Sequence, residues 1–404
     1  MKKLKKLFAS LSILFCFIFL NSCGVDILEP LGENSYYVIR YSSGNPKTGV
    51  ASTEYIGKTD NLLVYVESGY SYSLQNILVV AQKFENYYRS MINIYGNHTD
   101  MDNNGKIKLL FVNINGNSIG NIMVRGYFLP SDLIYGSGNN GEILYMDINL
   151  LNSKPNEIAG TVLHEFQHLI NFNVNYLRKG KEMSLWLDEC LSESTSILFD
   201  SSVVQSRIKE FNQIDYYCFY TWYLPYPYQN YFVNYPSASM FMYWLYIKNG
   251  RNSNIFKRIA SSTQNEDYNK VLYTVSGYSS WGNLLKDWIN GVRIGTVSGA
   301  SIRTRSYSTL LYPGAVIYDG SQVRVNDSKE LSSNPGYITV RGNSTLTLGR
   351  SILNNNNSNN NENNNDEEEI ILQEIKNIEE MQNNNRETKY IDLTLDRNGK
   401  IRKY

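Results

Sequence analysis

Histidine and cysteine are scarce in this chain of 404 residues, which has three histidines and four cysteines. So few cysteines in so long a chain exclude a disulfide-based framework. Net charge is also lacking, because 38 Lys and Arg are balanced by 38 Asp and Glu. No overall field therefore attracts a polyanion, and we expect no nucleic-acid partner.

Two of the three histidines lie in one H-E-x-x-H motif at 164–168. A helix places residues four apart one above the other, so His164 and His168 can direct ring nitrogens at one ion. Glu165, beside the first ligand, would hold and deprotonate a water on that ion. Pro155 suits a first helical turn and apolar residues recur at helical spacing, so a helix is predicted here. The alternative is a buried helix whose histidines only bond their neighbours.

A zinc site of this type needs a third protein ligand, which must be a carboxylate because no histidine follows His168. The segment from Trp186 to Glu193 is predicted to be a second helix, with leucines on one side and acidic residues on another. Two carboxylates one turn apart fit a zinc ligand at Glu189 and, at Glu193, a partner that orients a ligating histidine. The alternative is a solvated acidic face.

The segments L-H-E-F-Q-H-L-I-N-F (163–172) and W-L-D-E-C-L-S-E (186–193) resemble the hyicolysin family of zinc metallopeptidases, which are Glu-zincins. The likeness spans roughly 52–297, with softer stretches at 98–111, 125–133 and 142–148. Asp188 and Cys190 depart from the family's W-L-N-E-G or W-L-N-E-M pattern, and the Cys190 thiol leaves an oxidation-sensitive or inhibitory role open. The resemblance implies a protease with an α+β fold. In that fold a mixed sheet and the H-E-x-x-H helix of a zincin-type domain precede a helical lower half and a small β-rich C-terminal region.

A donor to the developing oxyanion is suggested by a further resemblance. In the aminopeptidase-like branch of the Glu-zincins, a tyrosine at a downstream helix start fills this role in a Tyr-x-x-Gly-Ala context. The segment 235–239 resembles that context, with Tyr235 as the donor and with Ser237 and Ala238 as departures. Tyr127, in a strand-like segment, is the runner-up, and His98 ranks below both. The alternative is that Tyr235 is one of many packing tyrosines in a chain that contains 33.

The first 23 residues are typical of a bacterial lipoprotein signal. Four lysines precede an apolar run from Leu7 to Leu20, which is short for a transmembrane helix, and Leu20-Asn21-Ser22-Cys23 resembles a lipobox. We expect acylated Cys23 to anchor the protein in a lipid bilayer of the cell envelope, periplasmic or surface-exposed. An outer-membrane location stays open, and the alternative is an ordinary cleaved signal peptide. Cys190 and Cys218 would remain, and a disulfide between them is left open.

Length predicts more than one folding unit. Strands are expected at 36–41, 62–66, 106–112 and 142–149, and helices at 73–95, 240–247 and 284–289. The expected divisions are a signal peptide at 1–22, a tether at 23–50, the metallopeptidase domain at 51–298, a β-rich region at 299–353, an Asn-rich and acidic linker at 354–369, and a helix and β-hairpin at 370–404.

The turn-like segment 100–105 resembles the front half of an EF-hand loop, with Asp100, Asp102 and Asn104 as oxygen donors. Position twelve of that loop is Phe111 rather than Glu, and a strand follows. A tight turn is therefore the main interpretation. A structural Ca²⁺ at Asp100, Asp102 and Asn104 is the alternative.

These patterns lead to the hypothesis of a membrane-anchored zinc metalloendopeptidase that uses one Zn²⁺ and hydrolyses exported or extracellular polypeptides. An extended substrate is expected to pair by β-addition with the strand at 142–149. The alternative from another class is a non-catalytic surface adhesin or binding lipoprotein on a zincin scaffold.

Overall fold

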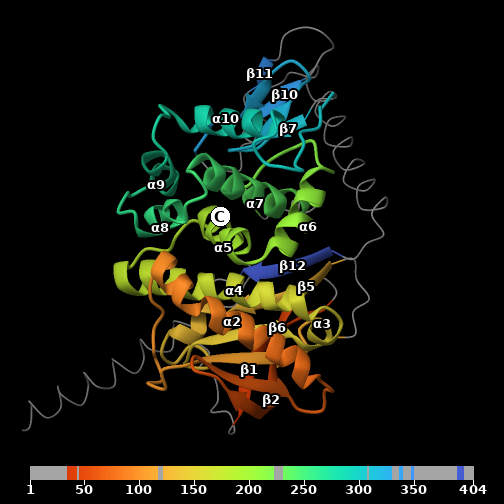
Figure 1. The fold of residues 1–404 in the computed structure, drawn as a ribbon, viewed down its shortest axis with the longest axis vertical. Coiled ribbons are helices and arrows are strands. Elements are labelled where there is room, and N and C mark those ends of the chain that lie inside the picture. Colours follow the sequence, from red (N-terminus) through yellow and green to blue (C-terminus); the bar gives the residue numbers. More distant parts are fainter. Residues whose placement is uncertain are drawn as a thin grey trace, which may run out of the picture.

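The computed structural model describes residues 34–42, 45–116, 122–222, 231–306, 309–329, 336–339, 347–349 and 389–394. These residues form an α+β fold in which a mixed sheet with its helices makes one half and a helical layer makes the other (Figure 1). Within the described ranges, no helix combines the length and the apolar character needed to cross a bilayer. The expected signal sequence and Cys23 lie outside them.

The large sheet holds the elements that carry the site. Its three central strands are parallel to one another, and the next strand, β5, runs antiparallel to its neighbour β6. Strands β4 and β6 are almost wholly buried, as expected for parallel strands covered on both faces. The strand order is β1 (Ser35–Ser42), β2 (Asn45–Lys58), β3 (Leu62–Glu67), β4 (Ile107–Val112), β6 (Ile143–Asp147), β5 (Ile122–Phe128) and β12 (Lys389–Thr394).

Strand β6, which corresponds to the strand expected at 142–149, is an interior strand. It bonds to β4 along one edge and to β5 along the other. An extended substrate has no free backbone groups to pair with there, so the expectation of β-addition to this strand is wrong. Sequence alone did not show that β5, which precedes β6 in the chain, lies outside it in the sheet.

Two helices cover the sheet next to the site. Helix α2 (Leu74–Tyr95) starts at Ser73, whose hydroxyl accepts from the Asn76 amide at 3.3 Å. Helix α4 (Pro155–Asn171) packs on α2 through Phe166, whose ring lies 5.0 Å from that of Phe84 and 5.6 Å from that of Tyr88. The short helix α3 (Ile148–Ser153) joins β6 to α4.

The helical half has an aromatic core. Phe219 stacks on Phe241 with ring centroids 4.2 Å apart, and the indoles of Trp186, Trp281 and Trp288 surround this pair. The elements here are the π-helical turn η2 (Phe172–Leu177), α5 (Leu185–Phe199), α6 (Ser201–Phe211), α7 (Tyr231–Lys248), α8 (Asn254–Ser261), α9 (Asp267–Thr274) and α10 (Trp281–Arg293).

The expected domain boundaries differ from what the described residues show. The sheet begins at Ser35, inside the segment expected to be a tether, because β1 pairs with β2 along its whole length. Beyond residue 299, Val316 exchanges backbone hydrogen bonds with Tyr217, so this region shares the core of the helical half. Its short strands are β7 (Thr309–Leu311), β8 (Val316–Tyr318), β9 (Val323–Val325), β10 (Gly336–Thr339) and β11 (Thr347–Gly349).

The C-terminal strand has an unexpected partner. The β-hairpin expected within 370–404 was to begin with a strand. That strand is found as β12, but its described partner is β5 of the large sheet. The rest of the hairpin, the helix expected before it and the linker lie outside the described residues.

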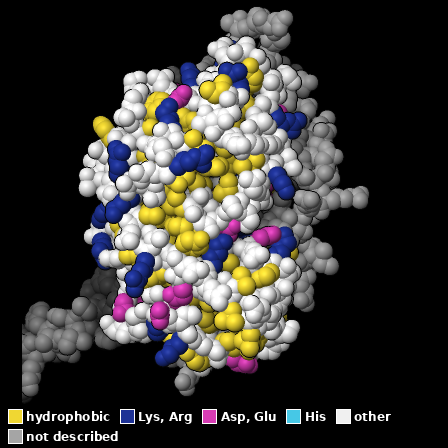
Figure 2. All heavy atoms as spheres, viewed as in Figure 1, with side chains coloured by type: hydrophobic (Ala, Val, Ile, Leu, Met, Phe, Trp, Pro, Cys, Tyr) yellow, Lys and Arg dark blue, Asp and Glu magenta, His cyan; other side chains and the backbone are white. Residues whose placement is uncertain are grey.

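On the face shown in Figure 2, basic and acidic side chains both occur, in keeping with the balanced charge.

Candidate metal centre

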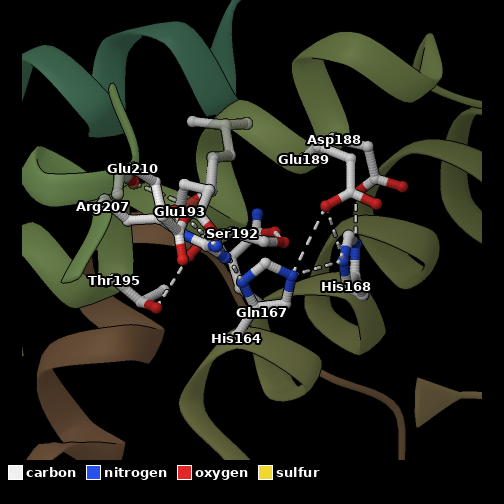
Figure 3. Close-up of polar contacts among 12 residues, drawn as sticks. His164, Gln167, His168, Asp188, Glu189, Ser192, Glu193, Thr195, Arg207 and Glu210 are labelled. Carbon is white, nitrogen blue, oxygen red and sulfur yellow. Dashed lines mark hydrogen bonds and ion pairs between the residues drawn. The ribbon is translucent and has the colours of Figure 1, made fainter. Parts of the chain in front are cut away.

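Helix α4 presents both motif histidines to α5. Residues Ile158 to Asn171 are all buried, and while Phe166 faces α2, His164 and His168 point toward α5 (Figure 3). The two Nε2 atoms lie 3.2 Å apart. Pro155 at the start of α4 and Glu157 in its first turn are favourable there, since proline suits the first helical position and a carboxylate suits the positive end of the helix dipole.

Helix α5 brings three carboxylates to these histidines. Glu189 Oε2 lies 3.5 Å from His164 Nε2 and 3.8 Å from His168 Nε2. Asp188 and Glu193, on either side of it along the helix, each face the Nδ1 atom of one histidine (Figure 3). The helices are tied together nearby, where the Ser192 hydroxyl donates to Gln167 of α4.

The donor atoms of His164, His168 and Glu189 fit a zinc ion. Ligand atoms about 2.0–2.1 Å from a tetrahedral zinc lie roughly 3.4 Å from one another. The three separations here are 3.2, 3.5 and 3.8 Å, and all three residues are buried. Two imidazoles and one carboxylate are also a donor set that zinc prefers. The structure thus brings together the three residues that the sequence proposed as ligands.

His168 is oriented by Asp188. Its Nδ1 donates to Asp188 Oδ1 at 2.9 Å, which leaves the Nε2 lone pair directed at the centre of the group. The same carboxylate oxygen accepts from Asn171 Nδ2 at 2.5 Å, and this bond fixes its position. Burial lowers the pKa of His168, but the adjacent carboxylates of Asp188 and Glu189 together outweigh this effect and raise the pKa above its usual value.

His164 faces a second carboxylate that is held by an arginine. Glu193 Oε1 lies 3.7 Å from His164 Nδ1. Arg207 of α6 binds the two oxygens of Glu193 in bidentate fashion, with nitrogen–oxygen distances of 2.8 and 2.9 Å, and it also contacts Glu210 at 3.1 Å. A fork of this kind holds a carboxylate in one plane. Glu193, which the sequence proposed as a partner of a ligating histidine, thus lies opposite the His164 imidazole.

Asp188, Asn171 and Arg207 were missed by the sequence reasoning. Asp188 was treated as a departure from a family pattern, although its position next to Glu189 was a usable signal, because neighbouring side chains on α5 can reach the same histidine. Asn171, one turn beyond His168, carried only a weak signal. Arg207 carried none, because α6 approaches Glu193 only through the tertiary fold.

The structure separates the two candidate tyrosines. Tyr235 is buried in α7 with its ring centroid 6.4 Å from that of His164, edge-on to Trp222, and beneath the Arg207 guanidinium at 4.8 Å. Tyr127 lies in β5, stacked on Tyr145, and its hydroxyl accepts from the Ile39 amide at 2.7 Å. Only Tyr235 is therefore brought next to a motif histidine.

The other motif and cysteine residues are buried. Glu165 is 1% exposed and lies between the two histidines on α4. Cys190 and Cys218, the two cysteines within the described ranges, are free thiols and form no disulfide. Burial, followed by the charges of Glu189 and Glu193, holds the pKa of Cys190 well above its usual value. A thiol that stays protonated is a poor target for oxidation, which argues against the oxidation-sensitive role.

A second group of carboxylates forms at the turn before β4. The structure brings the carboxylates of Asp100, Asp102 and Glu142 together, and the Asn104 side-chain amide donates to Asp102 at 2.7 Å. The Lys108 ammonium forms an ion pair with Asp102 at 2.5 Å. A cation of the protein thus already occupies this group, and we do not assign calcium to it.

Comparison with known proteins agrees with the site in general terms. No family model matches the chain. The chain is similar to the neutral metalloprotease ShpI of Staphylococcus hyicus, with 27% identity over 191 residues. The similar stretch covers 44% of this chain and 42% of the length of that protein. This partial similarity supports a metalloprotease function in general, and the buried His-His-Glu group is where a metal would be held.

Proposed function

We propose that the chain is a zinc metalloendopeptidase of the zincin type. The observation that carries the proposal is the spacing of the His164, His168 and Glu189 donor atoms, which matches the coordination shell of one zinc ion. When bound, zinc polarises a carbonyl and lowers the pKa of its water to about 7.

The residues of the chain have distinct tasks in this proposal. Glu165 takes the proton of the attacking water and passes it to the leaving amine. Asp188 and Glu193 keep the two imidazoles turned so that each Nε2 faces the group. Tyr235, whose ring lies next to that of His164, donates its hydroxyl hydrogen to the oxygen of the peptide carbonyl as negative charge develops on it.

A polypeptide substrate would bind in extended form along the edge of β5 that β12 occupies in this structure, after displacing that strand. Of the strands that lie at or next to an edge of the sheet, β5 is the one against which α4 packs. Backbone pairing at such an edge gives affinity with little dependence on side chains, which suits broad specificity.

The decisive experiment is Glu165→Gln in the purified chain. All three zinc ligands remain, so we expect zinc at one per chain and turnover of a mixed peptide library lower by at least about two orders of magnitude. Retained turnover would refute the role of Glu165. Zinc at one per chain with no hydrolysis even by the wild type would favour a binding protein instead.

We also propose that acylated Cys23 anchors the protein in the bacterial cell envelope, on the support of the lipobox-like sequence alone. Because the acyl chains supply the attachment, Cys23→Ser should move the protein from the detergent phase to the aqueous phase, or block its maturation. Unchanged partitioning would show that another segment holds it at the membrane.

A further inference from the structure

The outer edge of β5 runs to the candidate metal centre. Phe128, at the carboxyl end of β5, packs against Phe172 with ring centroids 6.0 Å apart. Phe172 follows His168 by one helical turn. A peptide chain paired along β5 would therefore lie beside the helix that carries both histidines.

In the structure this edge is already occupied by β12, a strand from the end of the chain. Lys389 pairs with Ile122, Ile391 with Val124, and Thr394 with Phe128. In the view of Figure 1, β12 lies between the layer of α4 and β5 and the helices α5 and α6. The strand thus covers the stretch of β5 that leads to the site.

We propose that β12 is a built-in competitor of the substrate: the edge of β5 is a docking site for an extended peptide, and residues 389–394 are its resident occupant. The inference rests on the proposed function, because it concerns access to the same site. It explains why a strand so late in the sequence returns to the sheet instead of joining the small strands β7–β11 that precede it.

The pairing has the properties of a contact that can be released. It is parallel, and parallel ladders are slightly less stable per residue than antiparallel ones. Its register shifts between Ile391 and Leu393, and such an irregularity interrupts the ladder. By contrast, β5 is held on its other side by antiparallel pairing with β6.

Tethering makes even a weak strand an effective competitor. Residues 350–388 separate β11 from β12 in the sequence, and a linker of the kind predicted by the Asn-rich, acidic composition of 354–369 gives an effective concentration on the order of 1 mM. If the free strand bound β5 with a Kd of about 0.1 mM, the tethered strand would occupy the edge about ten times out of eleven. Its release should therefore raise substrate affinity roughly tenfold.

The test displaces β12 from β5 without shortening the chain, in a protein called the unseated variant. In Ile391→Pro/Leu393→Pro, two backbone donors are lost and the strand cannot pair normally. The matched control is Asn359→Pro/Asn361→Pro, in the Asn-rich stretch that precedes β12 in the sequence. Binding of a fluorescent Lys-Tyr-Ile-Asp-Leu-Thr peptide is measured by anisotropy, with Glu165→Gln added to each protein so that the peptide stays intact.

We expect the unseated variant to bind the peptide about tenfold more tightly than the parent and the control. Hydrogen exchange gives a second measurement: the amides of 122–128 should lose protection in the unseated variant and regain it when the peptide is added. Equal peptide affinity in all three proteins, or unchanged protection of β5, would overturn the proposal.

Hydrolysis separates this inference from the proposed function. With Glu165 present, the unseated variant should show a roughly tenfold lower KM at unchanged kcat, and free peptide should restore the parent KM. If the unseated variant binds the peptide more tightly but neither the parent, the control nor the unseated variant hydrolyses it, the proposed peptidase function is refuted and the docking site on β5 is retained. If the parent and the unseated variant are both active and have the same KM, the proposal that β12 competes with the substrate is refuted, while the proposed peptidase function is retained.

Discussion

Two groups of clustered metal-type ligands occur among the described residues, and they differ in burial and in what already contacts them. His164, His168 and Glu189 are all buried, and their donor atoms approach one another at the separations of a zinc shell. In the second group Asp100 is exposed, and the Lys108 ammonium contacts Asp102. Proximity of acidic side chains is common to both, so it does not by itself identify a metal site.

The surroundings make the difference. In the buried group, Asp188 is hydrogen-bonded to the outer nitrogen of His168 and Glu193 faces that of His164 at 3.7 Å, while the inner nitrogens of both histidines are directed at a common point. In the second group, the Gly105 amide donates to Asp100 at 2.9 Å and the Met101 amide to Glu142 at 2.9 Å. Those donors turn the carboxylates toward the protein itself, as in an ordinary Asx-rich turn.

The largest expected effect tests this contrast directly. Glu189→Ala removes one of three protein ligands, so zinc should fall from one per chain to near zero, together with activity. Asp102→Ala, the matched change in the second group, should leave the zinc content unchanged. Elemental analysis after dialysis measures both. Loss of zinc in Asp102→Ala, or its retention in Glu189→Ala, would reverse the assignment of the two groups.

A tyrosine pair tests whether the buried group is also the reaction centre. Tyr235→Phe should lower kcat by about 10² to 10³ with little change in KM, because its hydrogen bond strengthens only as charge develops. Tyr127→Phe should leave kcat near the wild-type value, since that hydroxyl is bound to the Ile39 amide. Steady-state kinetics on one peptide decides between them. A near-wild-type kcat in Tyr235→Phe with zinc retained would show that Tyr235 only packs in the core.

The orienting carboxylates should have a smaller effect. Asp188→Asn and Glu193→Gln each weaken the hold on one imidazole and should lower zinc affinity about 10- to 100-fold. Glu142→Gln in the second group should leave it unchanged. Competition with a chromogenic chelator measures the affinities. If Glu193→Gln strips zinc completely while Glu189→Ala does not, the roles of these two glutamates are exchanged.

Sequence predicted the parts of the site that depend on spacing within one helix. The positions of His164 and His168 follow from the i, i+4 geometry of α4, and Glu189 and Glu193 follow from that of α5. Asp188 was misjudged because its target depends on how α5 crosses α4. That crossing is set by packing between helices and leaves no local pattern.

Pairing between strands that are far apart in the chain was the second feature that the sequence could not predict. The strands at β3, β4 and β6 were recognisable from their apolar runs, but their order in the sheet was not. That β5 lies outside β6, and that β12 covers β5, is decided by hydrogen bonds between segments far apart in the chain. The docking edge could therefore be found only in the structure.

The smallest expected effect concerns Lys108, whose ammonium pairs with Asp102 in the second group of carboxylates. The Lys108–Asp102 pair is partly buried, with side chains 14% and 21% exposed, so Lys108→Met should cost about 1 kcal/mol and lower Tm by roughly 1–2 °C. Without the ammonium, the oxygens of Asp100, Asp102 and Glu142 become available to a hard cation, and millimolar calcium should recover part of that loss. The wild type should show the same Tm in calcium and in chelator, since Lys108 already supplies the positive charge. Thermal denaturation of both proteins under both conditions measures this. A wild-type Tm that rises with calcium would show that Lys108 does not fill the group and that the contrast between the two groups is wrong.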